Sequence, residues 1–235
     1  MIDTEAPSVA LYVAHGDDNL ILAQRLGEWI SRAPELEIDI ALGNFALDHL
    51  GVARALYTRA GEIEGAGRTE DDFAMMRSER EFTNLLIVEQ PNGDFAHTIA
   101  RQFFFDVYQS LLWPELCASE DEALAGIAAR AARENAYHLE FTTGWMVRLG
   151  DGTEEAHRRA QTAVDDLWQF TAELAGDRLQ AWRNEVASVL DDAGLVVPDD
   201  PYQRSGGREG RHTEHLGHLL AEMQWMQRSY PDLEW

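Results

Sequence analysis

Apolar residues recur every three or four positions along most of the chain, which is the spacing of helices that bury one face. The first such segment runs from about Leu11 to Ser31, and Pro34 separates it from a second segment that runs from Glu35 to about Glu64. Gly65 follows the second segment and suits a helix C-terminus. At 1.5 Å per residue the second helix would be about 45 Å long, a length typical of helical bundles.

Capping and turn residues divide the remaining chain into further helices. Thr69 and Asp72 have the spacing of a capping pair, and Ser119 with Glu122 has the spacing of a capping box. Asp94 follows a turn and can cap another helix. The helices expected after Glu64 cover about 69–88, 94–113, 120–149, 153–174, a segment that ends at Gly194, and 213–229.

These segments predict an all-α fold, because no segment reads as a strand. Four long helices in about 11–150 would form a bundle, with added helices in about 153–195 and 213–229, in a single domain that spans 1–235. The segment from Val196 to Arg211 is rich in Pro and Gly, so we expect one long loop there, outside the core, and a last helix that serves assembly.

Composition and charge narrow the possible partners. Apolar residues make up 45% of the chain and charged residues 26%, which is ordinary globular usage. Acidic residues number 42 and basic residues 19, so the net charge is −23. A field of this sign repels phosphate backbones and anionic membranes, and we therefore expect neither nucleic acid nor membrane as a partner. Every basic residue is Arg, which excludes a catalytic or P-loop lysine.

Cysteine usage and the first residues suggest a reducing compartment. Cys117 is the single cysteine, so an intrachain disulfide is impossible, and its apolar surroundings in sequence predict that it is buried. Asp3 and Glu5 stand where a signal peptide would carry basic residues, and no apolar run is long enough to span a bilayer. We expect a soluble, cytoplasmic protein.

A helical bundle can hold a di-iron centre when carboxylates and histidines project inward, with a Glu-x-x-His motif on each of two helices. The second predicted helix has inward candidates in Asp48 and His49, but Val52 stands where the histidine should follow. On the fourth helix Asn135 replaces the Glu before His138. Neither helix therefore carries a complete Glu-x-x-His motif.

Five dispersed stretches resemble the structural (C) subunits of ring 1,2-phenylacetyl-CoA epoxidases, also called phenylacetic acid degradation protein C. These stretches are Trp29 to Pro34, Ala46 to Ala55, Ser78 to His97, Leu149 to Glu155 and Arg211 to Gly217. The resemblance implies a ferritin-like fold, and a subunit related to the catalytic di-iron subunit that has lost metal ligands.

The resemblance also places the six ligand positions of the catalytic subunit on this chain. They fall on Asn19, His49, Val52, Asp106, Asn135 and His138. Only Asp106 and His138 keep the expected ligand type. The neutral amides of the two Asn residues hold a dication weakly, and Val52 cannot bind one. We therefore expect no di-iron centre. His49, Asp106 and His138 would form a buried hydrogen-bond network, the alternative being a mononuclear metal site.

Two further groups carry polar or aromatic chemistry. The first lies near the C-terminus and comprises His212, Glu214, His215, His218 and Glu222. Spacings of three and four suit a zinc site, but we favour a surface helix that contacts a partner. The second group is Phe103, Phe104, Phe105, Tyr108 and Trp113, which we assign to the bundle core in preference to a substrate pocket.

The resemblance predicts a non-catalytic, scaffolding subunit of a multicomponent phenylacetyl-CoA monooxygenase. It implies that a partner subunit holds the di-iron centre, that a flavin and iron–sulfur reductase delivers electrons from NADPH, and that further small subunits complete a homo- or hetero-oligomer. No cofactor is expected in this chain. The alternatives are an independent metal-dependent oxygenase that uses His49, Asp106 and His138, and an iron-storage bundle.

Overall fold

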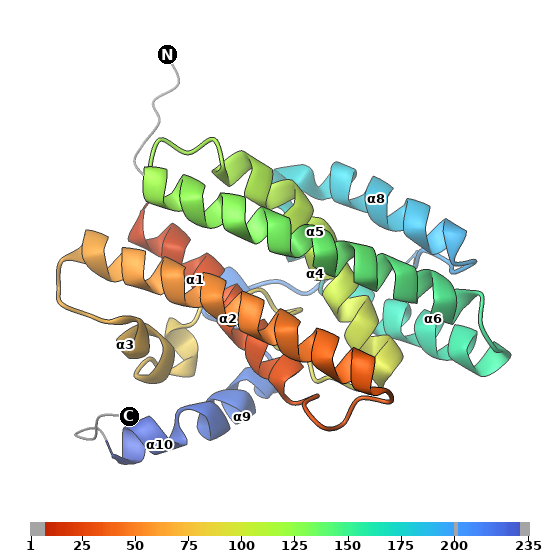
Figure 1. Cartoon of the computed structure of the whole chain (residues 1–235), viewed down its shortest axis with the longest axis horizontal. Helices are drawn as coiled ribbons and strands as arrows, with labels where there is room; N and C mark the ends of the chain where they lie inside the picture. Colours follow the sequence, from red (N-terminus) through yellow and green to blue (C-terminus); the bar gives the residue numbers. More distant parts are fainter. Residues whose placement is uncertain (1–7, 200–201, 231–235) are drawn as a thin grey trace.

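The computed structural model describes residues 8–199 and 202–230, and this part of the chain contains ten α-helices and no strand (Figure 1). Four are long: α1 (Val9–Gly27), α2 (Leu36–Glu64), α4 (Phe95–Leu116) and α5 (Glu122–Gly150). The others are α3 (Glu70–Met75), α6 (Glu154–Trp168), α7 (Ala172–Ala175), α8 (Leu179–Asp192), α9 (Glu214–Met223) and α10 (Trp225–Ser229). The all-α prediction is confirmed. Two parts of the sequence analysis lie outside the described residues. One is the argument against a signal peptide, which used residues 1–7, and the other is Pro201 of the predicted loop.

The four long helices form the bundle. Helix α1 packs along α2, α4 packs along α5, and α2 lies beside α5 (Figure 1). Helices α6 and α8 pack against α4 and α5, while α9 meets a short 3₁₀ turn at Glu79–Glu81. A Cβ atom at Gly16 would lie 2.5 Å from Cε1 of Tyr57, so glycine is what allows α1 and α2 to approach this closely.

Local capping fixes most of the helix ends. Asp94 accepts a hydrogen bond from the backbone N–H of His97 at 2.9 Å and begins α4 as predicted. Gly65 ends α2 with a φ of 67°, in the left-handed region. The expected capping box at Ser119 is wrong, because Asp121 is the N-cap of α5 and accepts from the N–H of Ala123 at 2.9 Å.

The aromatic stretch of α4 is core, as predicted. Phe103, Phe104 and Phe105 are fully buried, and Trp113 is 1% exposed. The indole N–H of Trp182 in α8 donates to the carbonyl of Phe104 at 2.9 Å, which ties an added helix to the bundle.

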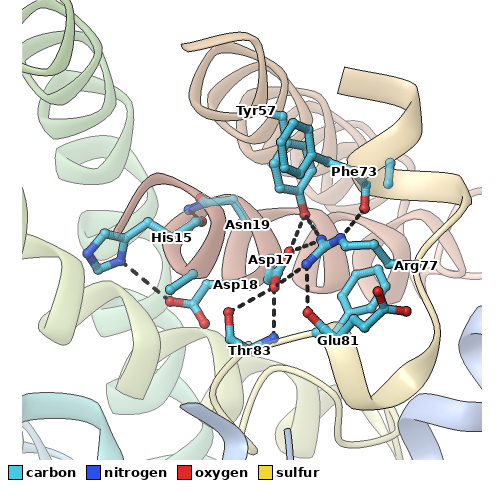
Figure 2. A network of polar contacts seen from close by, with 12 residues as sticks. His15, Asp17, Asp18, Asn19, Tyr57, Phe73, Arg77, Glu81 and Thr83 are labelled. Atoms are coloured by element: carbon cyan, nitrogen blue, oxygen red, sulfur yellow. Dashed lines mark hydrogen bonds and ion pairs between the residues drawn. The ribbon is translucent and has the colours of Figure 1, made fainter. Parts of the chain in front are cut away.

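The long helix predicted over 69–88 is wrong. The Thr69 capping box is present, but α3 ends at Met75 and the chain then runs irregularly across α1. Asp17 of α1 accepts from the backbone N–H of Thr83 at 2.7 Å, and it pairs with the guanidinium of Arg77 (Figure 2). Because these contacts need an extended backbone, they outweigh the local preference for helix.

Within the segment predicted as a loose loop, Val196 to Arg211, residues 206–208 pack into the body of the protein. Gly206 and Gly207 are buried, and the N–H of Gly207 donates to Glu173 at 3.0 Å. Arg208 pairs with the buried Asp18 of α1 at 2.6 Å. Burial alone would raise the pKa of Asp18, but the guanidinium outweighs it and the pKa lies below its usual value. This part of the segment therefore belongs to the fold.

Two smaller findings concern Cys117 and the apolar length of the helices. Cys117 is exposed, so the expectation of a buried thiol is wrong: Cys117 follows the last turn of α4 and faces solvent. Within the described ranges, no helix is both long and apolar enough to cross a membrane.

Candidate functional site

Three ligand-type residues converge in the middle of the bundle. His49 comes from α2, Asp106 from α4 and His138 from α5, and all three side chains are buried. One ligand atom from each lies within 4.8 Å of the others. Among the described residues, this is the one group of three or more His, Cys, Asp or Glu with such spacing. Three of the six predicted ligand positions therefore lie next to one another in the structure.

The remaining predicted positions surround the same point. Asn19, Val52 and Asn135 line a cavity of about 10 Å³ together with His49 and His138. A volume of this size is close to the minimum for one water molecule. The six positions thus form one centre, which is filled by side chains.

Gln102, which the sequence analysis did not single out, connects two of the three converging residues. Its side-chain amide N–H₂ lies 2.7 Å from Oδ1 of Asp106 and 3.1 Å from Nε2 of His49. The amide has two N–H groups, so it can donate to both. The one available signal was its position one helical turn before Asp106, on the inward face of α4.

The hydrogen bonds of His49 define its tautomer. Nδ1 lies 2.8 Å from Oδ1 of Asn19, an oxygen that also accepts from Gln109 at 3.2 Å. An amide oxygen only accepts, so Nδ1 carries the proton and Nε2 is the acceptor for Gln102. Burial, with a smaller contribution from nearby His138, holds the pKa of His49 well below its usual value, which agrees with a neutral ring.

The surroundings of Asp106 favour the neutral, protonated form of its carboxyl. Burial raises its pKa well above the usual value, although hydrogen bonds with Gln102 and Thr142 oppose the shift. The Thr142 hydroxyl lies 2.9 Å from Oδ2 of Asp106 and 3.0 Å from the carbonyl of His138. One hydroxyl proton cannot serve both oxygens. When Thr142 donates to the carbonyl, a protonated Oδ2 supplies the other hydrogen bond.

His138 faces the rim of the centre. Its Nε2 lies 3.1 Å from Oδ2 of Asp48, which is partly exposed, and its buried Nδ1 has no partner. Burial lowers the pKa of His138, while Asp48 opposes the shift. Asn135 donates to the backbone carbonyl of Asp106 at 3.0 Å, so its amide also serves the protein and not an ion.

This donor set does not fit a di-iron centre. A metal bound to His49 would need the Nε2 lone pair that now accepts from Gln102. A metal bound to Asp106 would need that carboxyl to ionise against the effect of its burial. Val52 contributes no ligand atom, and the two Asn side chains are neutral. The arrangement holds the four long helices together through hydrogen bonds.

The C-terminal polar group divides into an inward and an outward part. His212, expected at a surface, is instead buried: Nδ1 lies 2.8 Å from buried Glu89, and Nε2 lies 2.8 Å from the carbonyl of Phe82. Glu214 and His218 are exposed, and His215 is half-buried. In the part of the chain that the structure describes, these residues form no cluster with metal-ligand spacing, so the zinc alternative has no support.

Comparison with known proteins identifies the family of this chain. The family model described as phenylacetic acid catabolic protein matches residues 2–179 and 177–235. A 1,2-phenylacetyl-CoA epoxidase subunit from Escherichia coli (strain K12), the one designated C, is 48% identical over 238 residues, which cover 94% of this chain and 96% of that protein. The ferritin-like, all-helical architecture expected from the sequence is that of the matched family. The chain belongs to the phenylacetic acid catabolic protein family.

Proposed function

We propose that this chain is the non-catalytic, structural subunit of a multicomponent phenylacetyl-CoA 1,2-epoxidase that acts in aerobic phenylacetate degradation. The 48% identity to a subunit of an epoxidase of this kind, over nearly the full length of both chains, supports the assignment to this complex. The observation that supports the non-catalytic role is that the side-chain amide of Gln102 donates hydrogen bonds to both His49 and Asp106.

In this role the bundle contributes shape and not redox chemistry. The neutral network of Asn19, His49, Gln102 and Asp106 joins α1, α2 and α4 where an active relative would hold metal. A rigid bundle can stabilise a partner through a large interface without contributing to the reaction itself. The di-iron centre, the reductase and any small subunits belong to other chains, and the complex works in the cytoplasm.

Reconstitution of the epoxidase tests this role. Turnover of phenylacetyl-CoA is measured with the catalytic subunit and reductase, in the absence of this chain, with the wild-type chain, and with Asp106→Asn. We expect little turnover without the chain and equal turnover with both forms of it. Asn can accept from Gln102 and donate to Thr142 as the neutral carboxyl does, so the variant keeps the network.

A complex that loses turnover with Asp106→Asn, while still assembled, contradicts the proposal and favours the second candidate. That candidate is a metal-dependent oxygenase in this chain, and the convergence of His49, Asp106 and His138 within 4.8 Å is the observation in its favour. An iron-storage role has no comparable support, because it requires the carboxylate ligands that Asn19 and Asn135 replace.

A further inference from the structure

Polar atoms without a partner gather at the small cavity of the centre. Among the described residues, ten buried side-chain nitrogen and oxygen atoms have no hydrogen-bond partner within the chain. Four of them belong to residues that line this cavity: Nε1 of Trp113, Oε2 of Glu134, Oδ1 of Asn135 and Nδ1 of His138. Buried polar groups are normally paired, and unpaired ones often mark a bound water or ion. Their concentration around one cavity indicates an occupant.

Three of these residues are almost completely shielded from bulk solvent. Trp113 of α4 is 1% exposed, and Asn135 and His138 of α5 are 3% and 2% exposed. A donor or acceptor that is buried without a partner loses its hydrogen bonds with water and gains none in return. Three such groups at one place would weaken the contact between α4 and α5, unless a bound molecule pairs with them.

The other polar groups of the same side chains are already engaged. Asn135 donates from Nδ2 to the backbone carbonyl of Asp106 at 3.0 Å, which leaves Oδ1 as an acceptor. Nε2 of His138 lies 3.1 Å from Oδ2 of Asp48. A carboxylate only accepts, so Nε2 carries the ring proton, and Nδ1 of the neutral ring is an acceptor. The indole N–H of Trp113 only donates. The wall of the cavity therefore offers one donor and two acceptors.

This pattern defines the chemical class of the occupant. A metal cation or an ammonium ion has no lone pair with which to accept from the indole N–H of Trp113. An anion without a proton cannot donate to Oδ1 of Asn135 or to Nδ1 of His138. A neutral molecule that accepts one hydrogen bond and donates two can pair with all three groups. Water has this capacity.

The size of the cavity points to the same molecule. Its volume of about 10 Å³ suits one water and nothing larger, and three hydrogen bonds are the usual number for a buried water. Glu134, the fourth residue, has less need of a partner. Its side chain is 21% exposed, and its other carboxylate oxygen accepts from Arg130 at 2.8 Å.

We propose that the cavity binds one structural water molecule, which accepts a hydrogen bond from Nε1–H of Trp113 and donates to Oδ1 of Asn135 and Nδ1 of His138. This water links α4 to α5 at the centre. Through His138 it also joins the buried groups to Asp48 at the rim. The water site is a property of this chain alone and does not depend on the activity of the complex.

A high-resolution crystal structure of the full wild-type chain, grown in rubidium chloride, tests the site. We expect density for one water at about 2.7–3.2 Å from each of the three atoms, and no anomalous rubidium signal there. NMR spectroscopy of the ¹⁵N-labelled chain gives a second readout in solution. The indole proton of Trp113 should show a nuclear Overhauser cross-peak with water, and Trp113→Phe identifies that resonance by its loss.

Filling the cavity should remove the water. Val52 lines the cavity and is 5% exposed, and Val52→Ile adds one methylene group there. We expect the water density and the cross-peak of Trp113 to disappear in this variant. Val189→Ile, the same change at a half-buried residue of α8, is the matched control and should keep both. Ala131→Val, at another residue of the cavity wall, replaces Val52→Ile if circular dichroism shows unfolding or the new side chain turns away.

Three results would overturn the proposal. The first is a wild-type cavity without density, or one in which Trp113 donates directly to a neighbouring side chain. The second is an anomalous rubidium peak in the cavity, which would identify a cation site. The third is a cross-peak that persists in a variant whose cavity is filled, since the water that gives rise to it would then lie elsewhere.

Discussion

Replacing Asp106 by Asn separates a neutral network from an ionised ligand site. In the native state the carboxyl accepts from Gln102 at Oδ1 and contacts the hydroxyl of Thr142 at Oδ2. An Asn side chain has the same shape, with an oxygen that accepts and an N–H₂ group that donates. The variant therefore preserves the hydrogen bonds of a protonated carboxyl, whereas it would remove the charge of a carboxylate.

The effect on stability has a defined sign. The pKa of Asp106 in the folded protein lies well above the ordinary value of 3.8, so above that pH the folded state holds a proton that the unfolded state releases. Stability of the wild type then falls by about 1.4 kcal/mol for each pH unit, until the pH reaches the pKa of the folded state. Asn does not titrate, so the stability of the variant does not fall with pH for this reason. Asp106→Asn should be the more stable protein at neutral pH.

Urea unfolding of the two proteins at several pH values between about 5 and 7 measures this difference. We expect the variant to gain about 2.7 kcal/mol on the wild type over these two units if Asp106 stays protonated throughout. The exposed Asp192→Asn serves as the control and should follow the wild type at every pH. A wild type that is more stable than Asp106→Asn at pH 7, or a difference independent of pH, would refute the neutral carboxyl.

Three other predictions concern buried charges and the C-terminal segment. Glu89→Gln should lower the free energy of unfolding by about 3–5 kcal/mol, because it leaves His212 without the carboxylate that balances its charge. Burial lowers the pKa of His212, but its hydrogen bonds with Glu89 and Phe82 raise it further. In denaturation titrations the contribution of this pair should therefore be present below pH 6.5 and be lost as pH rises through the folded-state pKa of His212. Asp17→Asn should cost a similar amount, about 3–5 kcal/mol in chemical denaturation, since Arg77 then stays buried without its charge partner, while Glu155→Gln on the surface should leave the midpoint unchanged. Truncation after Pro198 removes Arg208 and His212, and it leaves Asp18 and Glu89 without these charge partners. Circular dichroism of the truncated chain should therefore show loss of cooperative melting. A truncated chain that melts like the full chain would contradict this prediction.

The helices that the sequence predicted well are those whose ends are set by nearby residues. The predicted second helix agrees with α2, because Pro34 and Gly65 fix its ends locally. The prediction failed at 69–88, where the competing partners are Asp17 and Asp18, more than fifty residues away in sequence. No local pattern contains that information, and tertiary hydrogen bonds decided the conformation.

The centre shows the same division. The resemblance located all six positions, and the structure brings them together around one small cavity and its neighbouring Asp106. The resemblance gave no indication of Gln102. Its bridging role between His49 and Asp106 depends on how close side chains from different helices lie in space. His212 was misplaced for a related reason: its partner Glu89 lies in a segment that the sequence analysis expected to follow a helix ending at Val88.

The iron content of the chain after anaerobic incubation with Fe(II) and desalting tests the central claim most directly, with Asp106→Asn treated in parallel. If the inherited centre is a neutral hydrogen-bond network and this subunit is structural, both proteins retain the same trace of iron, far below one ion per chain. Retention of about one iron per wild-type chain, lost in Asp106→Asn, would contradict the account.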